Sequence, residues 1–331
     1  MNDIYNASDL EHRELKRPQM IVENLLPVGL TILAGSPKLG KSWLVLGLAC
    51  SVADGVEFLH HPTAQGDVLL LDLEGSPFRI KERLQQAGLG FPEYLQICHD
   101  TPKLDTGFMG FLENWWSCAT LPRLIIIDTI VKIRGEGKRS SKNAYEADSE
   151  MFSPLQRFAL EKGVSIVVVT HLRKSNHYNG SSEDWIERIT GSMGLTGVSD
   201  NVWALFRQRG SKSAFLRTTS RDVDAGDFVL DFNDGCWRFV SDDINTYEFE
   251  NRPLVQFLKT IDVWNGVASE LCEKYKEFCN EHSLSDGLSQ TQPIVSFGKQ
   301  MRKVQAEAWR IRKSISIGKG RDGQHYSICN F

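Results

Sequence analysis

Residues 35–42 read Gly35-Ser36-Pro37-Lys38-Leu39-Gly40-Lys41-Ser42 and fit the pattern G-x-x-x-x-G-K-[ST]. An apolar run over 30–34 precedes them and predicts a strand, and a run from Trp43 to residue 53 predicts a helix. This context binds phosphate, because backbone N–H groups and the positive end of the helix dipole face the anion. We therefore expect residues 35–43 to bind a nucleotide, with Lys41 at the β- and γ-phosphates and Ser42 on Mg²⁺.

Lys38 occupies a position where many such loops carry glycine. Two interpretations stay open for it: a solvent-facing side chain, which we favour, and an additional contact to phosphate.

Composition limits the class of protein. The chain has 331 residues, 41% of them hydrophobic, and a net charge of −4, which is typical of a globular chain of one or two domains. No apolar run approaches the ~20 residues of a membrane span, and the polar N-terminus has no signal-peptide core. We expect a cytoplasmic protein without membrane contact. The negative charge excludes a surface that coats nucleic acid, so any such contact must come from local basic loops.

Seven cysteines are present, and no two have the C-x-x-C spacing. Neither a zinc ribbon nor a disulfide framework is expected. We predict ordinary reduced thiols that are mostly buried.

Each of three further apolar runs is followed by an ionisable side chain that could take part in catalysis. Residues 68–73 lead into Glu74, residues 124–127 into Asp128, and residues 164–170 into His171. Because the carboxyl ends of parallel strands form the ligand crevice, these side chains should meet beside the loop at 35–42. Asp128 supplies the oxygen ligand that Mg²⁺ prefers, and Glu74 would polarise the attacking water. Alternatively, Glu74 caps the helix predicted over 78–87, and His171 is a structural histidine.

The pattern of runs predicts an α/β fold with a mainly parallel sheet. Four short runs, 202–206, 214–217, 227–232 and 236–240, are separated only by turn residues. That spacing leaves no room for crossover helices, so we expect antiparallel strands that extend the sheet.

Two long polar segments interrupt the predicted sheet, over 132–150 and 172–190. Such loops are functional or disordered in a compact domain. Their basic residues are candidate contacts to nucleic acid: Lys138, Arg139, Lys142, Arg173 and Lys174.

We expect residues 1–20 to form an N-terminal arm, residues 21–241 the nucleotide-binding domain, and residues 252–331 a small C-terminal domain. The last contains helices over 267–281 and 293–304, then two short runs over 309–315 and 325–329 joined by a glycine-rich basic tip. This order predicts a winged-helix module. Its basic residues could contact DNA, form a solvated face, or belong to a protein-docking module: Lys299, Arg302, Lys303, Arg310, Arg312, Lys313, Lys319 and Arg321.

The ordered motifs GSPKLGKS, LLLDLEGSP, LIIIDT, VVVTH and GSMGLTGVSDNVWAL resemble those of the RecA-like ATPases of the plasmid and phage RepA-type replicative helicases. The resemblance covers roughly residues 20–240. It implies ATP and Mg²⁺ as ligands, a hexameric ring around single-stranded DNA, and possible replication partners such as a primase. It also implies the roles of Lys41 and Ser42 at phosphate and magnesium, Glu74 as catalytic carboxylate, Asp128 as Walker B acid and His171 as γ-phosphate sensor. The segments 132–146 and 172–190 correspond to the channel loops.

The sequence departs from that family at two positions. The acidic pair that often ends the second strand is here Glu74-Gly75, so one carboxylate must suffice. No arginine lies near residues 200–202, where the family places its trans-acting arginine. Arg221 is our first choice for that role by analogy with ring helicases, followed by Arg207 and Arg209.

The predicted function is that of an ATP-hydrolysing ring motor stimulated by single-stranded DNA, a replicative helicase of a plasmid, phage or mobile element. Two alternatives remain: a RecA-like switch or recombination protein that does not unwind, and a regulatory DNA-binding factor whose oligomerisation ATP controls.

Overall fold

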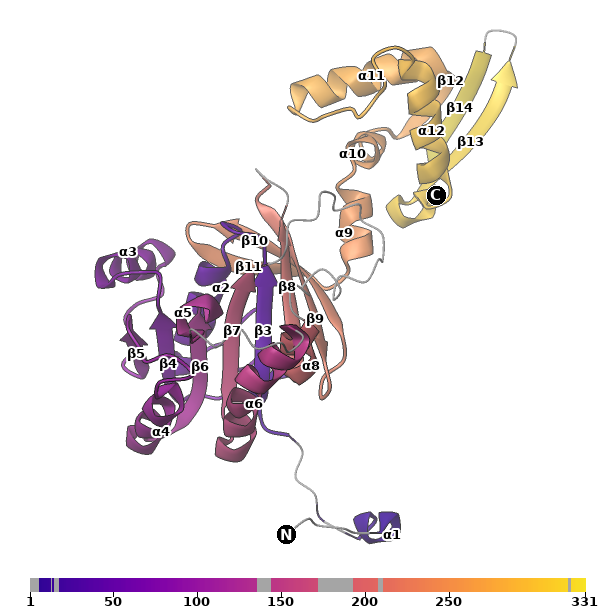
Figure 1. Cartoon of the computed structure of the whole chain (residues 1–331). Coiled ribbons are helices and arrows are strands. Elements are labelled where there is room, and N and C mark those ends of the chain that lie inside the picture. The colour runs from indigo at the N-terminus through magenta and orange to yellow at the C-terminus, as the bar shows by residue number, and fades with distance from the viewer. Residues whose placement is uncertain are drawn as a thin grey trace. The chain divides into compact units, whose positions relative to one another are not determined.

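The computed structural model describes residues 6–12, 14, 18–135, 144–171, 193–207, 211–320 and 323–331, with the backbone alone for 144–148 and 193–195. The chain divides into two compact units, Met1–Asp242 and Asp243–Phe331 (Figure 1). In the part of the chain that is described, no helix combines the length and the apolar character that crossing a membrane requires.

The first unit is built on a nine-stranded sheet with the strand order β11-β10-β9-β8-β3-β7-β6-β4-β5. From β8 to β5 all neighbouring strands are parallel, and from β8 to β11 they are antiparallel. The predicted α/β class is therefore confirmed. The strands are β3 (Gly29–Gly35), β4 (Asp67–Asp72), β5 (Leu95–Cys98), β6 (Pro122–Asp128), β7 (Ser165–His171), β8 (Asn201–Arg207), β9 (Ser213–Ser220), β10 (Gly226–Asn233) and β11 (Cys236–Ser241).

The direction of β8 corrects the prediction that all four later strands are antiparallel. β8 lies parallel to β3, with Thr31 opposite Asn201, and only β9, β10 and β11 are antiparallel additions. That prediction was based on the short turns that follow β8, which do not determine the direction of β8 itself. The connection before it, from residue 172 to residue 200, is long enough to return the chain to the other end of the sheet and contains α8 (Met193–Val198).

Helices cover both faces of this sheet because its central strands are apolar on both sides. All seven residues of β3 are buried. Leu33 packs into one core with α2 (Lys41–Asp54) and α3 (Pro77–Ala87). Leu30 and Ile32 pack into a second core with α4 (Phe108–Cys118), α5 (Ile130–Ile133) and α6 (Ala144–Lys162). The alternation of side chains along a strand divides the two cores.

Before β3, the described part of the predicted arm contains one helical turn, α1 (Ala7–Leu10), and the chain then enters a two-stranded sheet of β1 (Met20–Val22) and β2 (Leu26–Pro27).

The second unit has its own core and a three-stranded antiparallel sheet with the order β12-β14-β13. The predicted strand over 309–315 is wrong in its first half. Residues 308–311 form a 3₁₀ turn, and Arg312 has φ +54°, which breaks an extended run. The elements are α9 (Ile244–Glu250), α10 (Pro253–Lys259), β12 (Val263–Val267), α11 (Ala268–Glu281), α12 (Pro293–Gln305), η1 (Ala308–Ile311), β13 (Lys313–Gly320) and β14 (Gly323–Asn330).

The two units divide between Asp242 and Asp243, inside the polar stretch over 242–252 that separates the predicted domains, and helix α9 of that stretch belongs to the second unit. The carboxylate of Asp243 accepts the Thr246 N–H at 2.9 Å and starts this helix as an N-cap.

All seven cysteines are free thiols, as expected. The expectation that most are buried is wrong, since only Cys50, Cys272 and Cys279 are.

Candidate active site

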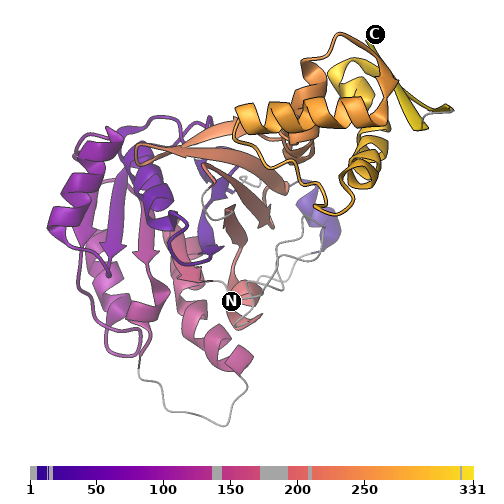
Figure 2. The ribbon, with the colours of Figure 1, turned by 90° about the horizontal axis from the view of Figure 1, so that it is seen from above.

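The loop between β3 and α2 is held by its own backbone geometry and by the β10–β11 hairpin. Gly40 has φ +99°, in the region that favours glycine, and a Cβ there would lie 3.0 Å from the Trp237 ring. The indole Nε1 of Trp237 donates to the Gly40 carbonyl at 3.0 Å. Figures 1 and 2 show this hairpin extending to the start of α2. A distant hairpin thus fixes the turn that precedes the helix N-terminus.

Lys41 is buried in the first turn of α2. Its ammonium group donates to the carbonyl of Gly35 at 2.7 Å and to that of Ser36 at 3.0 Å, and its Nζ lies 3.3 Å from Nδ1 of His171. Burial lowers the pKa of Lys41 to about 8, against the pull of Asp128 and Glu74, which favour the charged form. A lysine held this way is poised to exchange carbonyl partners for a phosphate anion.

Two carboxylates face the first turn of α2 from the ends of neighbouring strands. Asp128 closes β6, and burial raises the pKa of its carboxyl, while a hydrogen bond with Ser42 opposes that rise. Glu74 follows β4 and its Oε1 accepts from the Thr129 hydroxyl at 3.2 Å. The paired oxygens of Ser42 and Asp128 are the hard ligands that Mg²⁺ prefers, so the side chains present fit this ion.

A third carboxylate, Asp72, lies directly opposite Asp128 in the β4–β6 register. Burial raises its pKa, and Nδ1 of His99 lies 3.6 Å from its Oδ2. A Cβ on Gly75 would come within 1.7 Å of that same Oδ2. Asp72 therefore occupies the space beside the turn that carries Glu74, and only glycine fits at residue 75.

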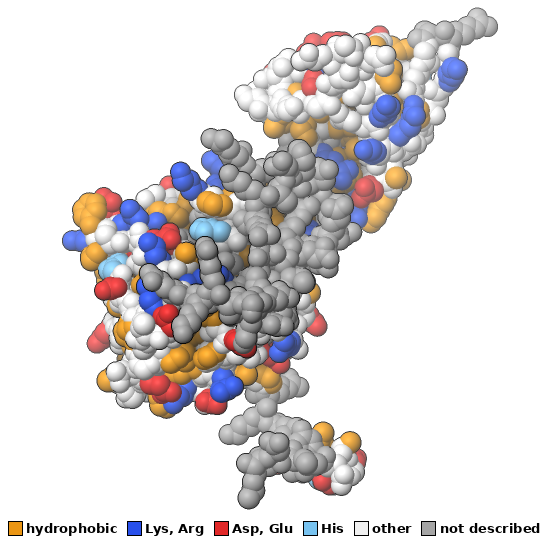
Figure 3. All heavy atoms as spheres, viewed as in Figure 1, with side chains coloured by type: hydrophobic (Ala, Val, Ile, Leu, Met, Phe, Trp, Pro, Cys, Tyr) orange, Lys and Arg blue, Asp and Glu red, His pale blue; other side chains and the backbone are white. Residues whose placement is uncertain are grey.

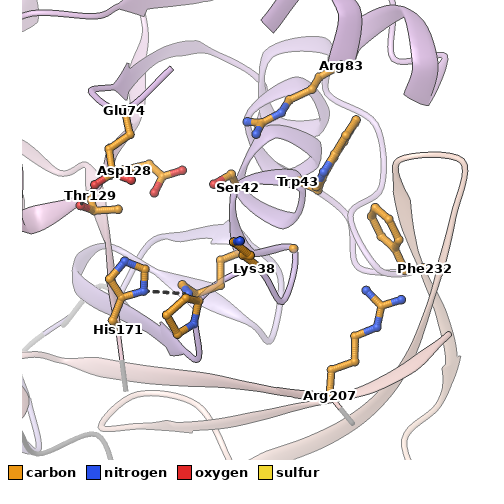
Figure 4. Close-up of a pocket in the computed structure, with 13 residues that line it drawn as sticks. Lys38, Ser42, Trp43, Glu74, Arg83, Asp128, Thr129, His171, Arg207 and Phe232 are labelled. Carbon is orange, nitrogen blue, oxygen red and sulfur yellow. Dashed lines mark hydrogen bonds between the residues drawn. The ribbon is translucent and has the colours of Figure 1, made fainter. Parts of the chain in front are cut away.

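These side chains open onto a cavity of about 550 Å³, the size of a small-ligand site. Figure 4 shows Glu74, Asp128 and Ser42 gathered at one end, and Phe232 and Arg207 at the other. The lining residues are Pro37, Lys38, Gly40, Lys41, Ser42, Trp43, Glu74, Arg83, Asp128, Thr129, His171, Arg207 and Phe232.

The far end of the cavity is aromatic and cationic. The Arg83 guanidinium lies 5.3 Å from the centre of the Trp43 ring, and that of Arg207 lies 5.2 Å from Phe232. Trp43 and Phe232 meet edge to face at 5.9 Å. Flat rings and guanidinium planes suit a nucleobase beyond the phosphate site.

Most of the residues predicted for the site are brought together. Glu74, Asp128 and His171 line the cavity with most of the loop. Gly35 and Ser36 contribute carbonyls to Lys41, whereas Leu39 packs against the core. The sequence analysis did not name Arg83, Thr129 or Phe232: Arg83 and Phe232 lie in no local motif, and Thr129 only closes the motif LIIIDT that points to Asp128. The predicted DNA contacts Lys138, Arg139, Lys142, Arg173 and Lys174, and also Arg209, lie outside the described residues.

Arg221 does not line this cavity. Its side chain is 60% exposed; Nη1 lies 3.6 Å from the Asp200 carboxylate and Nη2 donates to the Gly197 carbonyl at 3.3 Å. Arg207, the second choice for a trans-acting arginine, lines the cavity of its own chain instead.

The lowered pKa of Lys41 predicts a pH dependence of nucleotide affinity. Phosphate binds the protonated lysine. Above pH 8 the free protein has lost that proton and must recover it on binding, so affinity should fall by up to about tenfold per pH unit. ADP affinity, measured by calorimetry in EDTA from pH 7 to 9.5, should be flat to about pH 8 and then decline. Constant affinity up to pH 9.5 would show that Lys41 keeps its proton in the empty site.

The strand order, the loop before α2 and the carboxylates beside it define a P-loop ATPase with a RecA-like core. A family model described as an AAA domain (AAA_25) matches residues 4–177, more than half of the chain. The chain belongs to this AAA domain family, and the predicted enzyme class, an ATPase, is confirmed.

Two solved structures have a similar fold. The ATPase domain of G40P is 15% identical, with a TM-score of 0.50, over 64% of this chain and 85% of that one. A DnaB-like replicative helicase, described with its interactions with primase, is 13% identical, with a TM-score of 0.55, over 71% of this chain and 66% of that one. At such identities the likeness concerns the fold, and it confirms the predicted RecA-like core. No curated protein matches the chain.

Proposed function

We propose that this protein is an ATP-hydrolysing motor that assembles into a ring, is stimulated by single-stranded DNA and unwinds duplexes, as a replicative helicase of a plasmid, phage or mobile element. The observation that carries the proposal is the convergence of Lys41, Ser42, Glu74, Asp128 and His171 on one cavity, from the ends of three parallel strands and the first turn of α2. The family membership supports the ATPase step.

The ATP phosphates would lie along the first turn of α2. Lys41 releases the Gly35 and Ser36 carbonyls and binds the β- and γ-phosphates. Ser42 and Asp128 would hold Mg²⁺, which would offset the negative charge of the phosphates when bound. The adenine ring would extend towards Trp43 and Phe232, where aromatic faces are available.

Glu74 is the residue that orients the attacking water. It lines the cavity from the opposite side to Lys41's helix, and the Thr129 hydroxyl holds one of its oxygens. The second oxygen remains to accept a proton from water as it attacks the γ-phosphorus.

His171 links hydrolysis to DNA. Its ring contacts Lys41 at the last residue of β7, and the chain continues directly into the segment 172–190, which carries Arg173 and Lys174. When ATP is bound, His171 would contact the γ-phosphate, and after hydrolysis it would return to Lys41. This movement would shift the start of the basic segment that follows. Lys138, Arg139 and Lys142 form the second proposed contact to the DNA backbone.

In the proposed ring, each subunit would supply an arginine to the active site of its neighbour. Arg221 is outside its own cavity and exposed, as an arginine that completes a neighbour's site must be. We propose a hexamer with ATP at each subunit interface. The related DnaB-like structure, with its primase interactions, supports a replication partner of that kind, and we propose the cytoplasm as the place of action.

Strand displacement from a forked duplex tests the proposal. With ATP and Mg²⁺, the wild-type protein should release the labelled strand, and the Lys41→Ala variant should not. Rapid hydrolysis without strand release would favour the alternative of a nucleotide-controlled switch that does not unwind.

A further inference from the structure

We propose that the second unit, Asp243–Phe331, is a separate binding site for double-stranded DNA, which it contacts through the outer face of α12 and the β13–β14 hairpin. This site is additional to the proposed single-strand contacts of the first unit.

The outer face of α12 is free of the core. Phe297, Met301 and Val304 turn inward and are buried. Lys299, Arg302 and Lys303 point outward and are exposed, at helical spacings that place them on one side. Every charged residue of α12 is therefore positive and accessible.

The charge is also segregated within the unit. Between residues 287 and 320 there are seven basic residues and one acidic residue, Glu307. Helix α11 has the opposite character, with four exposed glutamates: Glu270, Glu273, Glu277 and Glu281. Figure 3 shows Lys and Arg side chains gathered over the part of the unit that carries α12 and β13.

The α12 charges differ from ordinary surface charges in having no counter-charge. Lys276 pairs with Glu273 at 2.8 Å, and Lys259 pairs with Glu250 at 3.0 Å. Among the described residues, none of Lys299, Arg302 and Lys303 has a carboxylate within 4.0 Å. Unpaired cations that repel one another are stabilised by a polyanion, whose phosphates also release counterions on binding.

The geometry favours a duplex over a single strand. A helix of this length spans about 20 Å and has the width that the major groove admits. Gln290, Thr291 and Gln292 are exposed just before it and offer amide and hydroxyl groups to base edges. The exposed Lys319 of the hairpin would reach a flanking phosphate. Single-strand binding relies on aromatic stacking, and the one aromatic residue of α12, Phe297, is buried, while the exposed Trp309 lies beyond this helix in η1.

The test measures binding of the full-length protein, without nucleotide, to a fluorescent 30-base-pair duplex at several salt concentrations. The variant Lys299→Ala/Arg302→Ala/Lys303→Ala is compared with the control Lys259→Ala/Lys274→Ala/Lys276→Ala, which removes the same charge from α10 and α11. We expect the α12 variant to bind more than tenfold more weakly and to flatten the salt dependence by about two to three in slope. The control should stay within about threefold of wild type, and both variants should keep the melting temperature.

Three outcomes would overturn the proposal: equal losses in both variants, no loss in the α12 variant, or displacement of the labelled duplex by an unlabelled single strand as readily as by duplex. If the α12 face binds an acidic protein instead of DNA, the α12 variant will show no loss of duplex binding, which is the second of these outcomes. Failure of the proposed motor function can be distinguished from failure of the proposed duplex-binding site. ATP hydrolysis stimulated by single-stranded DNA should survive in the α12 variant, and duplex binding should survive in Lys41→Ala.

Discussion

The Lys41→Ala variant is expected to lose ATP turnover by at least about 10²- to 10³-fold, the usual cost of removing one preorganised charge from a reacting oxyanion. Lys41 is the only basic residue in the first turn of α2, and its ammonium group already lies within 3.0 Å of two loop carbonyls. Lys38 also lines the cavity, but its side chain is exposed on the loop, whereas that of Lys41 is buried in the first turn of α2. Steady-state phosphate release measures the effect.

The matched control is Lys81→Ala, an exposed lysine of α3 that does not line the cavity. It should hydrolyse ATP within about twofold of wild type, as surface substitutions do. Hydrolysis by Lys41→Ala at more than a tenth of the wild-type rate would refute the assignment of the phosphate site.

Arg221→Ala is expected to reduce turnover by about 10³-fold or more, since arginines supplied in trans contribute 10³ to 10⁵ in phosphoryl transfer. The chain should still fold, because Asp200 keeps two other donors, the Leu30 N–H at 2.9 Å and the Gln156 amide at 2.8 Å. Arg238→Ala, an exposed arginine on β11, is the control and should retain activity.

Mixing separates a trans-acting arginine from a structural one. Arg221→Ala keeps an intact P-loop, and Lys41→Ala keeps an intact Arg221, so a mixed ring contains interfaces that combine both intact halves. In an equal mixture about a quarter of the head-to-tail interfaces are of that kind, and turnover should recover towards that fraction. No recovery after subunit exchange would place Arg221 outside the catalytic interface.

The proposed phosphate site was predictable because each part of it is local in sequence. The loop at 35–42 has its own pattern, and Glu74, Asp128 and His171 each follow an apolar run. Because parallel strands bring their carboxyl ends to one edge of the sheet, these local patterns also predict that the side chains lie close together. The structure places all three side chains on the cavity.

The aromatic end of the cavity was not predictable, because it depends on packing between distant segments. Phe232 and Trp237 come from a hairpin that reaches α2 only through the order of strands in the sheet. Arg207 enters the cavity because β8 is parallel to β3, a direction set by the chain before β8 and not by the short turns after it. Which of Arg207 and Arg221 faces the cavity also depends on the order of strands in the sheet.

Stimulation of this ATPase by DNA is measured by the rate of ATP hydrolysis at increasing concentrations of a single-stranded oligonucleotide, with Mg²⁺ and saturating ATP. We expect a saturable rise of about tenfold or more in the rate, because DNA bound to the proposed loops and completion of the proposed ring would bring Arg221 to the neighbouring site. A rate that stays constant across the titration would contradict the proposed function.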